Sequence, residues 1–180
     1  MIRSIFHSVI RRFERQFDYD ATYMHEILDA SKGAFFKLVL AQAMNSHREG
    51  VALDALFAAR IAAVRFEDCG PCAQLVVDMA LQAGVAPPMV RAIVARDLSR
   101  MSSDALLGMR LADAVLAHES TDEIRREVLA RYGEKGLVTL AYSIAGTRIY
   151  PTMKRALGHA HTCERLRVDG ETVVAARAAA

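Results

Sequence analysis

Apolar residues recur every three or four positions along most of this sequence, which is the spacing of one face of an α-helix. Residues 52 to 66 show the pattern clearly, with Leu56, Phe57, Ile61 and Val64 on one face. The 180 residues contain only four prolines and ten glycines, and 53% of them are hydrophobic. The sequence therefore predicts an all-α fold, a single-domain helical bundle that spans residues 1 to 180.

Glycines, prolines and capping residues divide this pattern into separate helices. Ser102 or Ser103 caps one of them, Ser120 with Glu123 forms a capping box for another, and Pro151 is expected to kink the last. The expected helices span residues 1–20, 22–30, 33–46, 52–66, from the cysteines to Gly84, 87–98, 103–118, 121–132 and 134–158.

The last part of the chain has a different pattern. Residues 166–168 and 172–174 are short β-prone runs that flank Asp169-Gly170, a dipeptide typical of tight hairpin turns. A small hairpin is expected within the tail, residues 165 to 180.

The first helix is amphipathic and basic, with Phe6, Ile10 and Phe13 on one side and arginines mostly on the other. Such a helix can lie on an anionic membrane surface, or it can pack against the core or a sister subunit. We favour packing. The helices offer more apolar faces than one small bundle buries, which predicts a homo-oligomer.

Charge and hydropathy narrow the expected partners. A net charge of +2 is too small to predict a nucleic-acid partner. No apolar run approaches the ~18 residues of a membrane span, and the N-terminus lacks the pattern of a secretory signal. We therefore expect a cytoplasmic protein with no membrane span.

Two of the three cysteines form the motif CGPC, Cys69 to Cys72, at the start of an expected helix. In a reducing compartment, such a pair is more typical of redox or metal chemistry than of a structural disulfide. Unpaired N–H groups at a helix N-terminus stabilise a thiolate, which favours Cys69, and Pro71 suits the first helical turn. The spacing also brings Cys72 to the same side, so a reversible disulfide can form.

Zinc is the alternative ligand for this pair, because His159, His161 and Cys163 could complete a tetrahedral site. Their spacing is awkward on a helix, so we expect no metal and no cofactor. Two acids, Glu67 and Asp68, precede the dithiol, and a carboxylate there can accept a thiol proton.

CGPC also occurs in thioredoxins, but there it follows a core strand. Three segments here, ALDALFAARIAAVRFEDC, GPCAQLVVDMALQAGV and EKGLVTLAYSIAGTRIYPTMKRALG, together resemble the carboxymuconolactone decarboxylase superfamily, specifically its alkyl hydroperoxidase D-like branch. The resemblance covers roughly residues 30 to 160. It implies an all-α oligomer whose Cys69 and Cys72 reduce a hydroperoxide or a disulfide and are themselves reduced by an external dithiol.

The family pattern E-x(11)-C-x-x-C-x-x-x-H adds a proton relay to the second cysteine, which attacks peroxide. At its Glu and His positions this chain has Phe57 and Val76, so the relay is missing. Glu67, or less readily Asp54, is the candidate substitute.

Three functions remain open from the sequence. The leading one is a CxxC thiol-disulfide oxidoreductase or weak alkyl hydroperoxidase, with catalytic candidates Cys69, Cys72 and Glu67. The helix terminus favours Cys69 as the nucleophile, whereas the resemblance favours Cys72. A non-catalytic oligomer or small-ligand-binding protein is the alternative, and a lactone-acting enzyme is a third.

Overall fold

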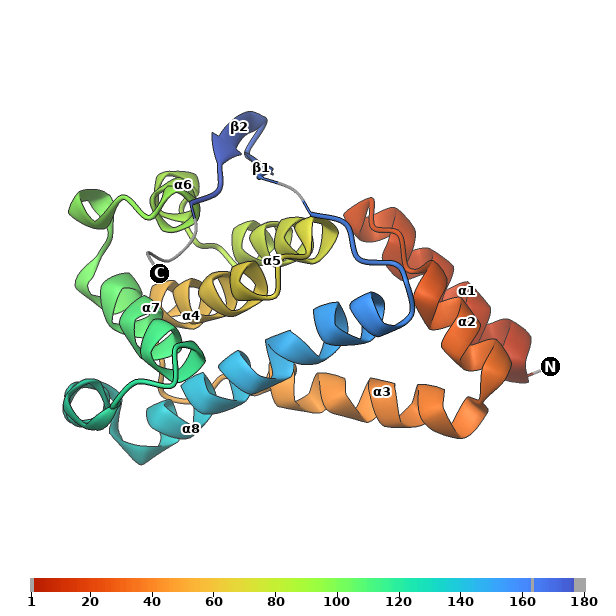
Figure 1. Cartoon of the computed structure of the whole chain (residues 1–180), viewed down its shortest axis with the longest axis horizontal. Coiled ribbons are helices and arrows are strands. Elements are labelled where there is room, and N and C mark those ends of the chain that lie inside the picture. Colours follow the sequence, from red (N-terminus) through yellow and green to blue (C-terminus); the bar gives the residue numbers. More distant parts are fainter. Residues whose placement is uncertain (1, 163, 177–180) are drawn as a thin grey trace.

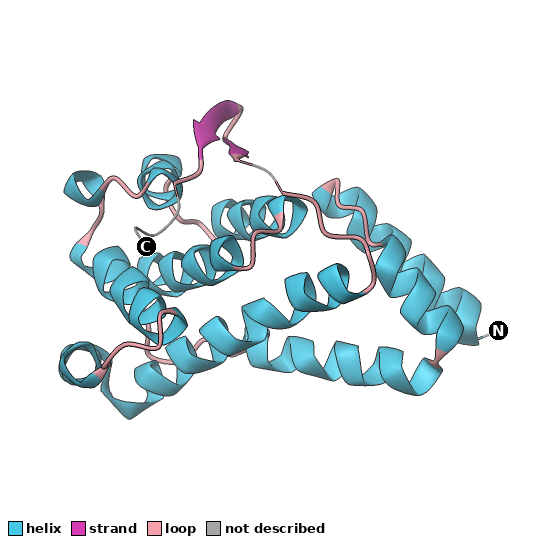
Figure 2. Cartoon of the chain, viewed as in Figure 1, coloured by secondary structure: helices cyan, strands magenta, loops and turns pink. Residues whose placement is uncertain are grey.

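The structure is a computed structural model that describes residues 2–162 and 164–176, and most of this chain is helical (Figures 1 and 2). This confirms the prediction of a helical fold with a C-terminal hairpin. The elements are α1 (Ile2–Phe17), α2 (Thr22–Ala30), α3 (Lys32–Ser46), α4 (Leu53–Phe66), α5 (Gly70–Gln82), α6 (Pro87–Ala95), the 3₁₀ turn η1 (Leu98–Arg100), α7 (Ser103–Leu116), α8 (Asp122–Ala156), β1 (Arg165–Val168) and β2 (Glu171–Val174).

Helix α4 forms the centre of the molecule and contacts α5, α6, α7 and α8. Eleven consecutive residues, Ala55–Arg65, are buried, and five of them are alanines. The small side chains let helices approach closely. At the crossing of α4 and α7, a Cβ atom added to Gly108 would lie 2.1 Å from the carbonyl oxygen of Ala55. The central bundle, α4 to α8, is therefore packed nearly backbone to backbone at this point.

Helices α1, α2 and α3 form a second group, the layer α1–α3: α1 and α2 lie side by side at one end of the molecule, and α3 runs from that end back to α8, which it contacts (Figure 1). Their buried side chains form a second hydrophobic cluster, which includes Ile10, Tyr23 and Phe35. Phe6 of α1 packs against Phe35 of α3, with ring centroids 5.5 Å apart. Thus Phe6 and Ile10 of α1 pack within the chain, as we favoured, whereas Ile5 and Val9 on the same helix are largely exposed. No helix in the described part of the chain is long and apolar enough to span a membrane.

Two local predictions were wrong, and a third was right. The helix from residue 87 ends at Ala95, because Arg96 adopts a left-handed conformation (φ 53°), and η1 follows. The capping box is not formed, since Thr121 is the N-cap of α8 and makes no side-chain cap bond. The non-helical residue within α8 is Gly133 (φ 66°, ψ −171°), which agrees with the predicted boundary there.

The hairpin prediction is confirmed. Asp169 and Gly170 both have positive φ, 51° and 81°, as the favoured two-residue turn requires. Leu166 pairs with Val173, and strand β1 contacts α5 and α6. Because Leu166 and Val168 are buried in the main hydrophobic cluster, the hairpin closes one side of the bundle near the start of α5.

A buried dithiol beside an apolar cavity

The two cysteines of CGPC lie where α5 begins. Cys69 is the N-cap, and its carbonyl accepts the first helical hydrogen bond from the N–H of Ala73 at 2.9 Å. Pro71 occupies the first turn, where its missing donor would have no helical partner. Cys69 and Cys72 form a disulfide, with their Cα atoms 5.3 Å apart. The helix start therefore sets the two sulfurs at bonding distance, as the spacing predicts.

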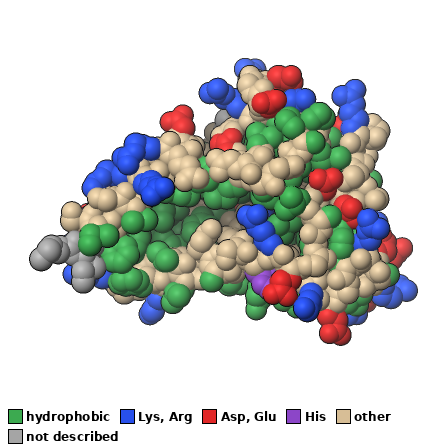
Figure 3. Space-filling view, turned by 180° about the vertical axis from the view of Figure 1, so that it is seen from behind, with side chains coloured by type: hydrophobic (Ala, Val, Ile, Leu, Met, Phe, Trp, Pro, Cys, Tyr) green, Lys and Arg blue, Asp and Glu red, His purple; other side chains and the backbone are tan. Residues whose placement is uncertain are grey.

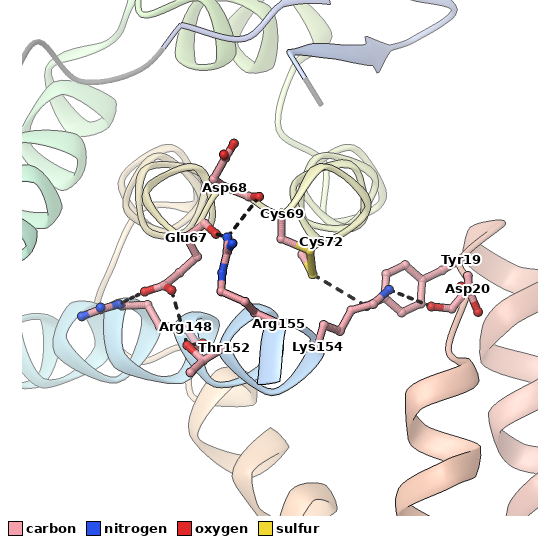
Figure 4. Close-up of a disulfide and its surroundings, with 10 residues drawn as sticks. All are labelled: Tyr19, Asp20, Glu67, Asp68, Cys69, Cys72, Arg148, Thr152, Lys154 and Arg155. Atoms are coloured by element: carbon pink, nitrogen blue, oxygen red, sulfur yellow. Dashed lines mark hydrogen bonds and ion pairs between the residues drawn. A yellow bond between two sulfur atoms is a disulfide. The ribbon is translucent and has the colours of Figure 1, made fainter. Parts of the chain in front are cut away.

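The turn that carries Cys69 is held from α8 (Figure 4). The guanidinium of Arg155 donates hydrogen bonds to the backbone carbonyls of Glu67 and Asp68. Asp68 adopts a left-handed conformation, with φ 51°, which turns the chain from α4 into α5. On the other side, the N–H of Gly70 donates to the carbonyl of His161 at 2.8 Å. Segments from both sides thus fix the position of the dithiol.

Only one of the two cysteines of the disulfide lines a cavity. Both are buried, with exposed fractions of 0% for Cys69 and 3% for Cys72. Cys72 lines a cavity of about 650 Å³, whereas Cys69 is not among the lining residues. A ligand in the cavity would therefore meet Cys72 first.

The cavity lies between the layer α1–α3 and helices α4, α5 and α8 of the central bundle. Seen from behind, the molecule has a hollow lined mainly by hydrophobic side chains (Figure 3). Its volume falls within the ~300–1,000 Å³ typical of small-molecule sites. Aromatic side chains make up much of the wall: Phe13, Phe17, Tyr19, Tyr23, Phe35, Phe57 and Tyr150.

Among the described residues, the hydroxyl of Tyr19 is the side-chain polar group in hydrogen-bond contact with the sulfur of Cys72. Its hydroxyl lies 3.8 Å from that Sγ, and because a disulfide sulfur carries no proton, the hydroxyl is the donor. Burial raises the pKa of Tyr19 to about 12, so the hydroxyl keeps its proton at neutral pH. The dithiol therefore faces a hydrogen-bond donor across the edge of the cavity.

A buried lysine stands behind this tyrosine (Figure 4). The Nζ of Lys154 lies 4.5 Å from the ring centroid of Tyr19 and 5.3 Å from that of Tyr23. It also donates a hydrogen bond to the carbonyl of Asp20 at 3.0 Å. Burial lowers the pKa of Lys154. This cation–π contact fixes the loop that presents Tyr19 to Cys72.

The sequence offered no signal for these two residues. Tyr19 is 53 positions from Cys72, and no local motif links them. Lys154 lies in α8 among other charged residues, so its burial could not be distinguished from exposure by periodicity alone.

Glu67, the predicted proton acceptor, is turned towards α8. Its Oε1 is 2.5 Å from the Nε of Arg148, and its Oε2 accepts a hydrogen bond from Thr152 at 3.4 Å. In Figure 4 this carboxylate points away from the sulfurs, on the far side of Arg155. Its role in proton transfer stays a prediction. Asp54 lies at the opposite end of α4, where it accepts a hydrogen bond from Ser102 at 2.8 Å.

No family model, curated protein or solved structure matches this chain. The likeness to alkyl hydroperoxidase D-like proteins therefore stays a hypothesis based on the CGPC segments. The geometry adds one fact to it. Phe57 and Val76, which stand at the relay positions of that family, both line the cavity with Cys72.

The alternative metal site is not assembled in the part of the chain that the structure describes. No three His, Cys, Asp or Glu residues there are grouped so that they could hold a metal ion. His159 instead contacts Glu26, with 2.7 Å between Nε2 and Oε2. Cys163, the third member of the predicted cluster, lies outside the described residues.

Proposed function

We propose that this chain is a dithiol oxidoreductase of the alkyl hydroperoxidase D-like type, which reduces organic hydroperoxides through Cys69 and Cys72. One observation carries the proposal: Cys72 pairs with Cys69, lines a cavity of about 650 Å³ and lies 3.8 Å from the hydroxyl of Tyr19. Such an arrangement suits an apolar substrate that must reach a buried sulfur.

In the proposed reaction the reduced Cys72 thiolate attacks the terminal oxygen of the hydroperoxide. The O–O bond breaks, an alcohol leaves after protonation, and Cys72 becomes a sulfenic acid. The thiolate of Cys69 then attacks the Cys72 sulfur, which releases water and forms the disulfide. An external dithiol reduces this disulfide by thiol-disulfide exchange and becomes oxidised in turn. Two electrons thus pass from the dithiol donor to the peroxide.

Two features of the site favour a thiolate without the family's Glu and His. The N-terminus of α5 stabilises negative charge on sulfur in its first turn. The Tyr19 hydroxyl donates towards Cys72, and a hydrogen bond to the charged form lowers a thiol pKa. We assign the attack to Cys72, because it borders the cavity, and the resolving step to Cys69.

The test measures consumption of cumene hydroperoxide by reduced wild-type protein, Cys69→Ser and Cys72→Ser, with dithiothreitol as the external dithiol. We expect saturable turnover by the wild type and none by Cys72→Ser. Cys69→Ser, first reduced and then freed of dithiothreitol, should react once and stop at a sulfenic acid, which dimedone traps. If all three proteins react no faster than free cysteine, the peroxidase proposal fails. If the protein turns over a disulfide substrate but no hydroperoxide, the proposed function is restricted to thiol-disulfide exchange.

The cavity itself favours a second candidate function, a non-catalytic small-ligand-binding protein. Its apolar wall is formed by side chains from six helices, α1 to α5 and α8, and needs no sulfur chemistry to hold a ligand. Ligand affinity that is unchanged in Cys72→Ser, together with absence of thiol turnover, would support this alternative.

We also propose that the chain forms a homo-oligomer in the cytoplasm. Helix α3 exposes Phe36, Val39 and Leu40 by 46%, 45% and 69%. Adjacent exposed apolar side chains are typical of association surfaces. A reducing compartment would supply the dithiol donor.

A further inference from the structure

The cavity contains a buried positive charge. Arg60 projects from the middle of α4, lines the cavity and is only 5% exposed. Its Nε donates to the hydroxyl of Ser143 at 3.3 Å, and its Nη2 donates to the carbonyl of Asn45. These neutral acceptors satisfy donors but do not balance the charge.

No carboxylate of the described residues pairs with Arg60, although buried charges are normally paired. Burial lowers the pKa of Arg60, and the positive charge of Arg48 lowers it further, to about 10. Even so, the guanidinium remains cationic at neutral pH. Glu49, the acid next in the chain, contacts Lys135 instead, at 3.7 Å.

The guanidinium groups of Arg48 and Arg60 lie close to the same part of the cavity wall, the ring of Phe57. Their guanidinium carbons lie 5.7 Å (Arg48) and 5.3 Å (Arg60) from the ring centroid of Phe57. One region of the wall is therefore polar and positively charged, while the rest is aromatic and aliphatic.

The charged region and the sulfur are separated along α4. From Arg60 to the end of α4 at Phe66 the helix rises roughly 9 Å, at about 1.5 Å per residue. Cys72 follows in the next helix. A ligand that reaches both needs an anionic group at one end and an apolar chain several carbons long.

We propose that the cavity binds an amphipathic carboxylate of the fatty-acid class, with its carboxylate between Arg60 and Arg48 and its alkyl chain along the aromatic wall towards Cys72. A carboxylate matches the bidentate donors of a guanidinium and supplies the missing negative charge. That the natural ligand is a fatty-acid hydroperoxide, reduced at Cys72, rests on the proposed function. The binding itself does not.

The test measures binding to the oxidised wild-type protein by calorimetry, so that no thiol chemistry takes part. Dodecanoate is compared with dodecan-1-ol, which has the same chain and no charge. We expect dodecanoate to bind at least about tenfold more tightly, as one hydrogen bond to a charged group implies. Equal affinities, or no binding of either compound, would overturn the inference.

Two substitutions locate the carboxylate. Arg60→Met should abolish the preference for dodecanoate, and Arg48→Gln should reduce it severalfold. Because Arg60 is buried, its variant must first show the wild-type circular dichroism spectrum. Arg48 is exposed, so Arg48→Gln keeps the test decisive if Arg60→Met does not fold. Arg126→Gln, an exposed position in α8 that does not line the cavity, is the matched control and should bind as the wild type does.

The outcomes separate this inference from the proposed function. Carboxylate preference without hydroperoxide turnover would support the inference and contradict the peroxidase. Turnover of neutral cumene hydroperoxide through Cys72, with no preference for the carboxylate, would do the reverse. A preference that Arg48→Gln and Arg60→Met both leave intact would place the anion elsewhere and overturn the assignment.

Discussion

The central bundle and the layer α1–α3 are both helical, but they bury side chains in opposite ways. In α4 the residues Ala55–Arg65 are all buried, and alanines bring the helices close together. In α3 only Phe35 and Leu38 are buried, and the layer contacts its surroundings mainly through large aromatic side chains. The central bundle is therefore packed through short distances between helix backbones, and the layer α1–α3 is packed through large side chains.

This difference explains the position of the cavity. Small side chains that face each other leave little space, whereas rings that meet at tilted or edge-on angles leave gaps between helices. The cavity lies where the aromatic layer meets the bundle, and Cys72 and Arg60 face it from the bundle side. Cys72 and Arg60 thus come from the bundle and Tyr19 from the loop between α1 and α2, while side chains of both regions form the apolar wall.

The largest expected effect comes from the same substitution made in each region. In Gly108→Ala the new Cβ would lie 2.1 Å from the carbonyl oxygen of Ala55, so α4 and α7 must separate. We expect a loss of about 3 kcal/mol in the free energy of unfolding. Gly33→Ala in α3 meets only Ser31 Oγ at 3.9 Å. It should gain about 0.5–1 kcal/mol, since alanine favours the helix. Urea denaturation measures both.

Equal effects of the two glycine substitutions would contradict the comparison. A destabilised Gly33→Ala would mean that the layer is packed as tightly as the bundle. A neutral Gly108→Ala would mean that α7 can move away from α4 at little cost.

The fold could be predicted largely because local signals agree with tertiary packing. Backbone preferences that the tertiary structure does not override account for the end of α5 at Gln82, just before Gly84, for the end of α3 at Ser46 and for the Asp169-Gly170 turn. The misplaced end of α6 arose where a non-glycine residue adopted a left-handed conformation. Arg96 ends α6 with φ 53°, and its guanidinium is held by Asp113 in a two-bond pair, which the sequence does not reveal.

The candidate site could be predicted only in its local part. Cys69 and Cys72 are identified by their spacing within one turn. Tyr19, Arg60 and Lys154 contribute through burial and long-range contacts, and neither property follows from the residue type. From the sequence, Phe57 at the family's Glu position indicates that the relay is lost. The sequence could not show that Phe57 lines a cavity.

A smaller effect tests how the layer contributes to the dithiol. In Tyr19→Phe the hydroxyl 3.8 Å from the Cys72 sulfur is lost, while the ring and its contact with Lys154 remain. Because a hydroxyl that donates to a thiolate stabilises it, we expect the thiol pKa of reduced Cys72 to rise by about one unit, or about 1.4 kcal/mol, in the variant. The rate of alkylation by iodoacetamide, followed across pH, measures this shift.

The pH dependence has a definite sign. Below both thiol pKa values the variant should react about threefold more slowly, because a tenfold loss of thiolate is partly offset by the higher nucleophilicity of the more basic thiolate; above both it should react about threefold faster. The donor persists over the whole range, since the pKa of Tyr19 is raised to about 12. Tyr142→Phe, an exposed tyrosine whose ring contacts His47, is the control and should match the wild type. If the pH profile of the alkylation rate is the same in Tyr19→Phe as in the wild type, the Tyr19 hydroxyl does not affect the reactivity of the dithiol.

The smallest effect on folding is expected on the outer surface of the layer. Leu40 is 69% exposed in α3, so Leu40→Glu should change the free energy of unfolding by less than about 0.5 kcal/mol. If this face associates with a second copy, however, a buried carboxylate without a partner should lower the mass measured by sedimentation equilibrium. Leu98→Glu, 58% exposed in η1 beside the bundle, is the matched control and should leave the mass unchanged. If only Leu98→Glu loses assembly, the interface lies on the bundle and not on the layer. If the wild-type protein is itself a monomer, the exposed apolar face of the layer has no role in association.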